Sequence, residues 1–178
     1  EKNATSVCQD VFTNSAEFGV INQRDFFDHD VANVDNIQGY YIVRPNDYVY
    51  NPRISTTAPV GPINRNKLGC CGVMSPLYYV FRVEKQSDGI LHFLDYYFKS
   101  NMWHDFMFKN GNSGARSDRF SISDSTFSLM PILYPQKEEE QLNIGQVFIN
   151  MEKLMRTESI KLSKFRSMKQ SLLQKMFV

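Results

Sequence analysis

The chain has 178 residues, 42% of them hydrophobic and 22% charged, which is enough to bury one core and is typical of a soluble globular protein. No run approaches the roughly 18 apolar residues of a membrane-spanning helix. The net charge of +1 argues against a strongly basic nucleic-acid arm. Residues 1–48 hold eight acids against three bases, whereas residues 49–135 hold nine bases against six acids. Any affinity for DNA must therefore come from local loops.

Short apolar runs broken by Asn, Asp and Gly predict strands in the first half of the chain. Residues 40–43 and 48–50 flank Arg44-Pro45-Asn46-Asp47 and indicate two strands around a turn. Residues 51–62 contain three prolines and one glycine, which exclude a regular helix or a central strand. Residues 78–83 combine aromatic and β-branched residues and predict another strand.

The period of the apolar residues changes at residues 91–103, where Leu91, Leu94 and Phe98 fall on one helical face. After this helix, residues 110–114 indicate a flexible loop, and short strands are expected near residues 120–122. Residues 130–135 form a connector stiffened by two prolines, after which a helix can begin. We therefore predict an α+β domain with irregular, β-rich walls over residues 1–135.

Residues 136–178 predict one long C-terminal helix with a coiled-coil stripe. The apolar positions alternate in steps of four and three, which is the 3.5-residue repeat of a coiled coil. These positions are Ile144, Phe148, Met151, Met155, Leu162, Phe165, Leu172 and Met176, with Glu158 and Lys169 filling the two gaps. About 35 helical residues span roughly 50 Å, more than a small domain does, which argues against a helix that only covers its own domain.

Two identical copies of this helix can pair in an antiparallel register that matches apolar with apolar residues: Leu162 with Phe165, Met155 with Leu172, and Met151 with Met176. The same register sets Glu158 against Lys169 twice. A shift by one heptad would place these charges opposite Leu162 and Met151, at a cost of several kcal/mol if they were buried. We expect the first register, although the pattern equally suits a coil with a related but different helix.

The residues that could support chemistry are few. Cys70 and Cys71 are adjacent and lack the gap that zinc sites prefer, so with Cys8 we expect small buried thiols and neither a disulfide framework nor a metal site. The run Val83-Glu84-Lys85 resembles half of a nuclease site, but no Pro-Asp partner precedes it on a strand. No glycine-rich nucleotide fingerprint follows a strand either. We expect no catalysis, metal or cofactor in this chain.

Eight sequence tags, in this order, carry a resemblance to a known family. They are FGVINQ (18–23) with Phe26-Phe27, YNPRI (50–54), GVMSPLY (72–78) with Val80-Phe81, FLDYYF (93–98), GAR (114–116), PILYP (131–135), EQLNIG (140–145) and LLQKMF (172–177). The series resembles the specificity (S) subunit of Type I restriction–modification systems. One departure is the stretch after the Asn-Pro tag, which is glycine-rich in the family and here has only Gly61.

Members of that family usually carry two target-recognition domains and two conserved helices in a chain about twice this long, so this chain resembles half an S subunit. The resemblance implies either a cut-out C-terminal half or a short chain that works as a homodimer. The resemblance implies that a head of residues 1–135 reads one half of a bipartite double-stranded DNA target. It also implies that residues 136–178 form the conserved helix, which spaces the heads and docks the methyltransferase (M) subunits.

Further expectations come from the same resemblance. The restriction (R) subunit joins through the M subunits, S-adenosylmethionine belongs to the M partner, and the protein is expected in a prokaryotic cytoplasm without membrane contact. The alternative function, from a different functional class, is a coiled-coil protein-interaction module without a DNA role.

Two loops carry the candidate DNA-binding residues. The first holds Arg53, Ser55, Thr56, Thr57, Arg65, Asn66 and Lys67, and the second holds Lys109, Asn110, Asn112, Arg116 and Arg119. Arg and Lys bind guanine edges or phosphates, Asn pairs with adenine, and the Thr methyl can contact the thymine methyl. Arg65, Asn66 and Lys67 are expected to read bases, whereas Arg53 and Arg116 lie in the family tags and could clamp structure or bind phosphate. Both loops could also be ordinary polar surface.

Overall fold

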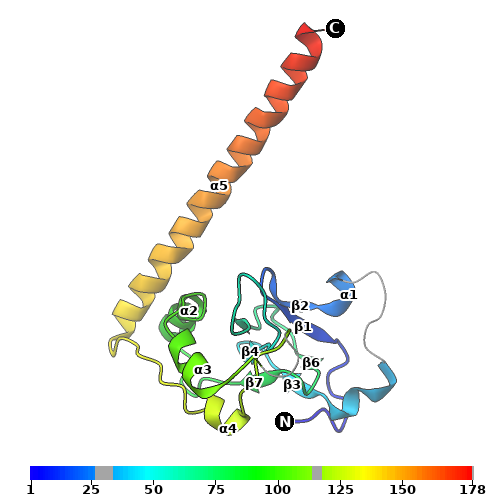
Figure 1. Cartoon of the computed structure of the whole chain (residues 1–178), viewed down its shortest axis with the longest axis vertical. Coiled ribbons are helices and arrows are strands. Elements are labelled where there is room, and N and C mark those ends of the chain that lie inside the picture. Colours follow the sequence, from blue (N-terminus) through cyan, green and yellow to red (C-terminus); the bar gives the residue numbers. More distant parts are fainter. Residues whose placement is uncertain (27–33, 114–117, 178) are drawn as a thin grey trace.

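The computed structural model describes residues 1–26, 34–113 and 118–177 of the chain. It confirms an α+β protein with a head domain and a long C-terminal helix, α5, which rises from one side of the head so that its C-terminus lies far from it (Figure 1). The expected boundary at residue 135 lies just before the start of α5 at Glu138.

The described part of the head contains three small antiparallel sheets. The first pairs β1 (Phe12–Ser15) with β2 (Gly19–Asn22), and the second pairs β3 (Tyr41–Val43) with β6 (Gly72–Met74). The third has the order β5 (Ile63–Arg65), β4 (Tyr48–Tyr50), β7 (Tyr79–Phe81). The short helices α1 (Gln23–Phe26) and α4 (Asp124–Phe127) and the 3₁₀ helix η1 (Val34–Gly39) complete the walls.

The predicted strands on either side of residues 44–47 are both present, and the amide of Asp47 donates to the carbonyl of Arg44 in the turn between them. They do not pair with each other, because β3 joins β6 whereas β4 is the centre of the third sheet. Tyr48, Val49 and Tyr50 are all buried. Successive side chains of a strand point to opposite faces, so Tyr48 and Tyr50 enter the main core while Val49 enters a second cluster.

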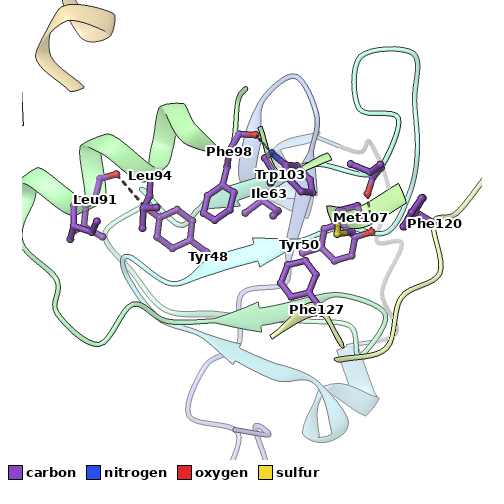
Figure 2. Close-up of a cluster of buried hydrophobic side chains, with 12 residues drawn as sticks. Tyr48, Tyr50, Ile63, Leu91, Leu94, Phe98, Trp103, Met107, Phe120 and Phe127 are labelled. Carbon is purple, nitrogen blue, oxygen red and sulfur yellow. Dashed lines mark hydrogen bonds between the residues drawn. The ribbon is translucent and has the colours of Figure 1, made fainter. Parts of the chain in front are cut away.

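The main core lies between the third sheet and helices α2 (Asp88–Tyr97) and α3 (His104–Asn110) (Figure 2). Leu91, Leu94 and Phe98 are buried on it, which confirms the predicted helical face. Ser87 caps α2 by accepting a hydrogen bond from the amide of Ile90.

Trp103 is buried in this core, and its Nε1 donates to the carbonyl of Phe98 at 3.2 Å, which fixes the turn between α2 and α3.

The structure tests two of the strand predictions, those for residues 51–62 and 120–122. The segment 51–62 forms only isolated backbone bridges, as its prolines require. The short strands expected near residues 120–122 are wrong, because this segment makes a single bridge between Asn112 and Ser121.

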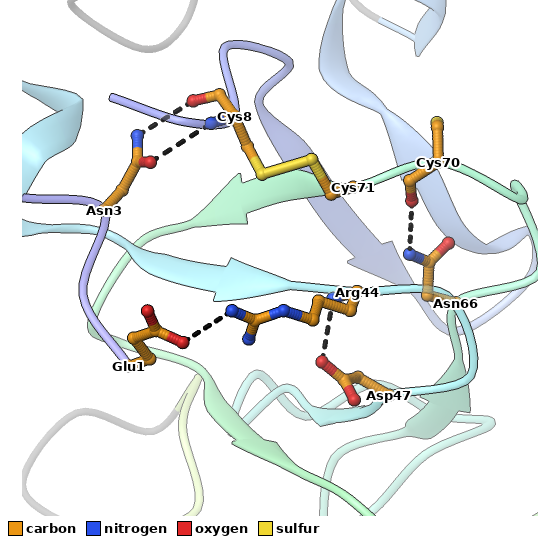
Figure 3. Close-up of a disulfide and its surroundings, with 8 residues drawn as sticks. All are labelled: Glu1, Asn3, Cys8, Arg44, Asp47, Asn66, Cys70 and Cys71. Carbon is orange, nitrogen blue, oxygen red and sulfur yellow. Dashed lines mark hydrogen bonds and ion pairs between the residues drawn. A yellow bond between two sulfur atoms is a disulfide. The ribbon is translucent and has the colours of Figure 1, made fainter. Parts of the chain in front are cut away.

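The prediction of three buried thiols is also wrong, because Cys8 and Cys71 form a disulfide and Cys70 is exposed (Figure 3). The two bonded residues are 63 positions apart in sequence, and their Cα atoms are 6.0 Å apart. They meet because the N-terminal segment lies along the second sheet, with a bridge between Lys2 and Tyr41. Sequence spacing carries no signal for such a long-range pairing.

Helix α5 (Glu138–Met176) has 39 residues and begins with Glu138, Glu139 and Glu140, whose negative charge is favourable beside the positive end of the helix dipole. Its first turns pack on α2. Gly145 allows the closest approach, since a Cβ at this position would lie 2.6 Å from the Cβ of His92. Gln141 is buried at the same junction, and its Nε2 donates to the carbonyl of Pro135 at 2.7 Å.

Two further contacts end the junction. The rings of Tyr96 and Phe148 stack with centroids 5.0 Å apart. The carboxylate of Glu152 accepts hydrogen bonds from Lys99 at 2.7 Å and from the Tyr96 hydroxyl at 3.0 Å. Every residue from 153 to 176 is exposed. Helix α5 therefore lies on its own head only over its first turns.

Replacing Gly145 by Val is expected to disrupt the junction, because the new side chain would collide with His92. Overpacking of this kind costs about 1–3 kcal/mol. Chemical denaturation should show a lower free energy of unfolding, and amides of residues 138–152 should exchange faster with deuterium. Gln146→Val, at the exposed neighbouring position, is the control and should leave both unchanged. Equal behaviour of the two variants would contradict the close α2–α5 packing.

Candidate nucleic-acid interface

The structure joins parts of the two candidate loops into one surface. Arg53 and Arg119 face each other in an antiparallel backbone bridge. The amide of Ile54 donates to the carbonyl of Asp118 at 3.0 Å, and the amide of Phe120 donates to that of Pro52 at 2.8 Å. Segments about 65 residues apart in sequence are therefore held side by side by main-chain hydrogen bonds. The buried ring of Phe120 anchors them to the core below (Figure 2).

We name this region the paired-loop surface. Its members are the predicted residues that the bridges bring together: Arg53, Ser55, Thr56, Thr57, Lys109, Asn110, Asn112 and Arg119. Of these only Arg119 is half-buried, and the others are exposed. The predicted Arg116 lies outside the described residues.

Local structure sets the shape of the paired-loop surface. Ser55 begins a tight turn, in which its Oγ accepts from the amide of Ala58 and lies 3.3 Å from the Oγ1 of Thr57. Lys109 sits in the last turn of α3, where the helix dipole favours a cation. The Nδ2 of Asn110 donates to the carbonyl of Phe106 within the same helix.

The chemistry of the paired-loop surface suits a polyanion. Three cationic side chains, Arg53, Lys109 and Arg119, stand with one exposed acid of the same segments, Asp118. Guanidinium and ammonium groups bind phosphate oxygens, and neighbouring hydroxyl and amide groups can reach phosphates or base edges. This arrangement is a candidate DNA contact.

The expected base-reading group of Arg65, Asn66 and Lys67 lies in a different environment, around the buried carboxylate of Asp95. The Nε and Nη2 of Arg65 donate to the two carboxylate oxygens at 2.9 and 2.6 Å, and the Nζ of Lys67 lies 2.7 Å from Oδ2. The side chains of Arg65 and Asp95 are only 11% and 6% exposed. Arg65 therefore neutralises a buried acid, which corrects its assignment as a reader of bases.

The Tyr48 hydroxyl completes this cluster by hydrogen bonding to the carbonyl of Leu91 at 3.1 Å and to Asp95 at 3.4 Å. Burial, followed by the charge of Asp95, raises the pKa of Tyr48 well above its usual value, so the hydroxyl remains a donor. A carboxylate inside a run of aromatic residues (93–98) was the signal in sequence that a buried cation partner was needed.

Asn66 is fully buried and cannot reach DNA in this structure. Its Nδ2 donates to the carbonyl of Cys70 at 3.0 Å and its Oδ1 accepts from the amide of Leu68 at 3.0 Å. The amide side chain is thus a clamp for the loop that follows β5, which corrects its assignment as an adenine contact. Lys67 alone of the three is exposed, with 58% of its side chain accessible.

A second candidate surface runs along α5. From Met151 on, the predicted stripe residues are exposed: Met151, Met155, Glu158, Leu162, Phe165, Lys169, Leu172 and Met176. Phe148, which belongs to the predicted stripe and interface, stacks on Tyr96 and is thus partly used within the chain. Val147, Leu154 and Met168 are also exposed beside the stripe and widen its apolar face. An exposed apolar face of this length, interrupted by Glu158 and Lys169, is typical of a docking surface.

The described residues contain neither a helix suited to crossing a membrane nor a cluster suited to holding a metal ion. None of the helices in ranges 1–26, 34–113 and 118–177 is long and apolar enough to cross a membrane. Within the same ranges, no three His, Cys, Asp or Glu side chains are grouped so that they could hold a metal ion.

Compared with known proteins, the chain matches no protein-family model and no curated protein.

Arg65→Ala is expected to destabilise the fold, because Asp95 would lose its bidentate partner inside the protein. Breaking a buried ion pair from one side costs about 3 kcal/mol or more. Lys67→Ala removes an exposed charge from the same carboxylate and should cost less than about 1 kcal/mol. Urea denaturation of the two variants measures this difference. Equal small losses would mean that Arg65 is not the main partner of Asp95.

Proposed function

We propose that the chain is a DNA-sequence-recognition subunit of a Type I restriction–modification enzyme, equivalent to half of an S subunit. The head binds one half of a bipartite target in double-stranded DNA. Helix α5 pairs with a second copy, or with the other half of a full S subunit, and docks the M subunits. Methylation and cleavage belong to partners: S-adenosylmethionine binds the M subunits, and the R subunit joins through them. The protein works in a prokaryotic cytoplasm.

The observation that carries this proposal is that α5 leaves the head after Glu152 with its apolar stripe uncovered. The anchored first turns give the helix a defined direction, and the uncovered remainder supplies a pairing surface. The combination suits a protein that holds two heads at a fixed separation. The sequence tags and the polyanion chemistry of the paired-loop surface favour DNA as the ligand of the heads.

The paired-loop surface can be tested through its salt dependence. The double variant Arg53→Ala and Lys109→Ala should bind DNA more weakly. The negative slope of log K against log salt should become less steep by about two, since each lost phosphate contact removes about one. Fluorescence anisotropy with duplex DNA at several salt concentrations gives this slope. The control pair Lys2→Ala and Lys85→Ala, both exposed lysines elsewhere, should keep it. An unchanged slope for the Arg53→Ala and Lys109→Ala double variant would mean that the paired-loop surface does not contact DNA phosphates.

The antiparallel register makes a charge-swap prediction. Glu158→Lys should weaken self-association, because it sets two lysines against each other in each of the two symmetric pairs. Adding Lys169→Glu to the same chain should restore the dimer, because the swapped charges attract again. Sedimentation equilibrium of the three proteins measures both effects. A double variant as weak as the single one would contradict this register.

The proposed function as a whole is tested by co-expressing the chain with the M subunit from its own genome and mapping methyladenine by long-read sequencing. A two-part palindromic motif is expected when two copies act as a complete S subunit. A chain that self-associates through α5 but neither binds DNA nor associates with the M subunit would instead be the alternative, a coiled-coil interaction module.

A further inference from the structure

The Cys8–Cys71 disulfide joins two parts of the head that differ in exposure (Figure 3). Cys8 is buried, whereas Cys71, which precedes β6, is half-buried. Cys71 is therefore the more exposed residue of the pair. Cys70 is exposed, and its side chain points away from the bond.

Non-covalent contacts also join the same segments. The Nδ2 of Asn3 donates to the carbonyl of Cys8 at 2.8 Å, and the amide of Cys8 donates to the Oδ1 of Asn3 at 3.2 Å. The amide of Val73 donates to the carbonyl of Asp10 at 2.8 Å. Cys8 also packs with Ile42 and Val73 in a small core cluster. The fold around Cys8 therefore does not rest on the disulfide alone.

The bond also anchors one end of a surface loop, residues 66–71 between β5 and β6. Asn66 clamps the first end of this loop and the disulfide anchors the last. Between them lie Lys67, Leu68 and Gly69, all exposed. Gly69 has φ +75°, a left-handed conformation that other residues rarely adopt. A loop held at both ends keeps this shape, and opening one end allows it to relax.

We propose that Cys8–Cys71 is a reversible disulfide, a thiol-exchange site that sets the order of the N-terminal segment and of the 66–71 loop. The reductant is a dithiol. One of its thiolates attacks the sulfur of Cys71, the Cys8–Cys71 bond breaks, and Cys8 leaves as a thiolate. The second thiol of the reductant, as its thiolate, then resolves the mixed disulfide and releases Cys71. The protein gains two electrons and two protons, and the dithiol becomes a disulfide.

The inference rests on the proposed function only in that the proposed function places the protein in a reducing cytoplasm. Disulfides there are mostly transient or redox-sensing. The chemistry itself is independent of DNA binding, so the two ideas can fail separately.

The test equilibrates the full chain in buffers of reduced and oxidised dithiothreitol and traps free thiols with a maleimide for mass spectrometry. Cys70 should be labelled in every buffer, whereas Cys8 and Cys71 should gain label together, in one reversible transition. Hydrogen–deuterium exchange on the reduced protein should show loss of protection at residues 1–11 and 66–73, with α2 and α5 unchanged. Cys8→Ala should reproduce the reduced pattern in all buffers, and Cys70→Ser should behave as the parent.

Three results would overturn the proposal. Labelling of all three cysteines in the most oxidising buffer would mean that the bond does not form. Reduction only in denaturant would mean a permanent structural bond. Loss of protection throughout the head on reduction would mean that the fold requires the bond.

Discussion

The packing of the first turns of α5 on α2 is the interaction on which the rest of the architecture depends. Gly145 brings the two helices into close approach, and the Tyr96–Phe148 stack and the Lys99–Glu152 ion pair end the contact. Without this junction the proline-containing connector 130–135 would leave the direction of α5 undefined. With it, the apolar stripe beyond Glu152 has a fixed relation to the head. Self-association through that stripe would then fix the separation of two heads.

The junction is linked to the core of the head through α2. One side of α2 supplies Leu91, Leu94 and Phe98 to the main core, and Asp95 between them binds Arg65 at the end of β5. Tyr96 and Lys99, from the following turn, contact α5. A single helix thus connects the third sheet to the projecting arm. The acid–base cluster at Asp95 stabilises that connection, which explains why Arg65 is not a surface residue.

The periodic parts of this fold could be predicted from the sequence, because their side-chain patterns reflect a single buried face. The spacing of Leu91, Leu94 and Phe98 defines α2, and the repeat from Ile144 to Met176 defines α5. Long-range pairing could not be predicted in this way. No local pattern places Cys8 beside Cys71, or assigns β3 and β4 to different sheets.

The candidate site also depends on both local sequence pattern and long-range structure. Residue type alone selects loops rich in Arg, Asn and Thr as candidate DNA contacts, and the bridge between Arg53 and Arg119 joins two of them. Residue type alone does not distinguish an exposed cation from Arg65, which neutralises a buried carboxylate, or an exposed amide from Asn66, which is buried. Burial, which depends on the whole fold, decides between these roles.

The most direct measurement is selection of binding sites from a random duplex library by the purified full chain. We expect enrichment of a short motif repeated in inverted orientation at one fixed spacing, because in the proposed function two heads read the halves and paired α5 helices set their distance. A dimeric chain that enriches no sequence would contradict the account and leave α5 as a protein-interaction helix alone.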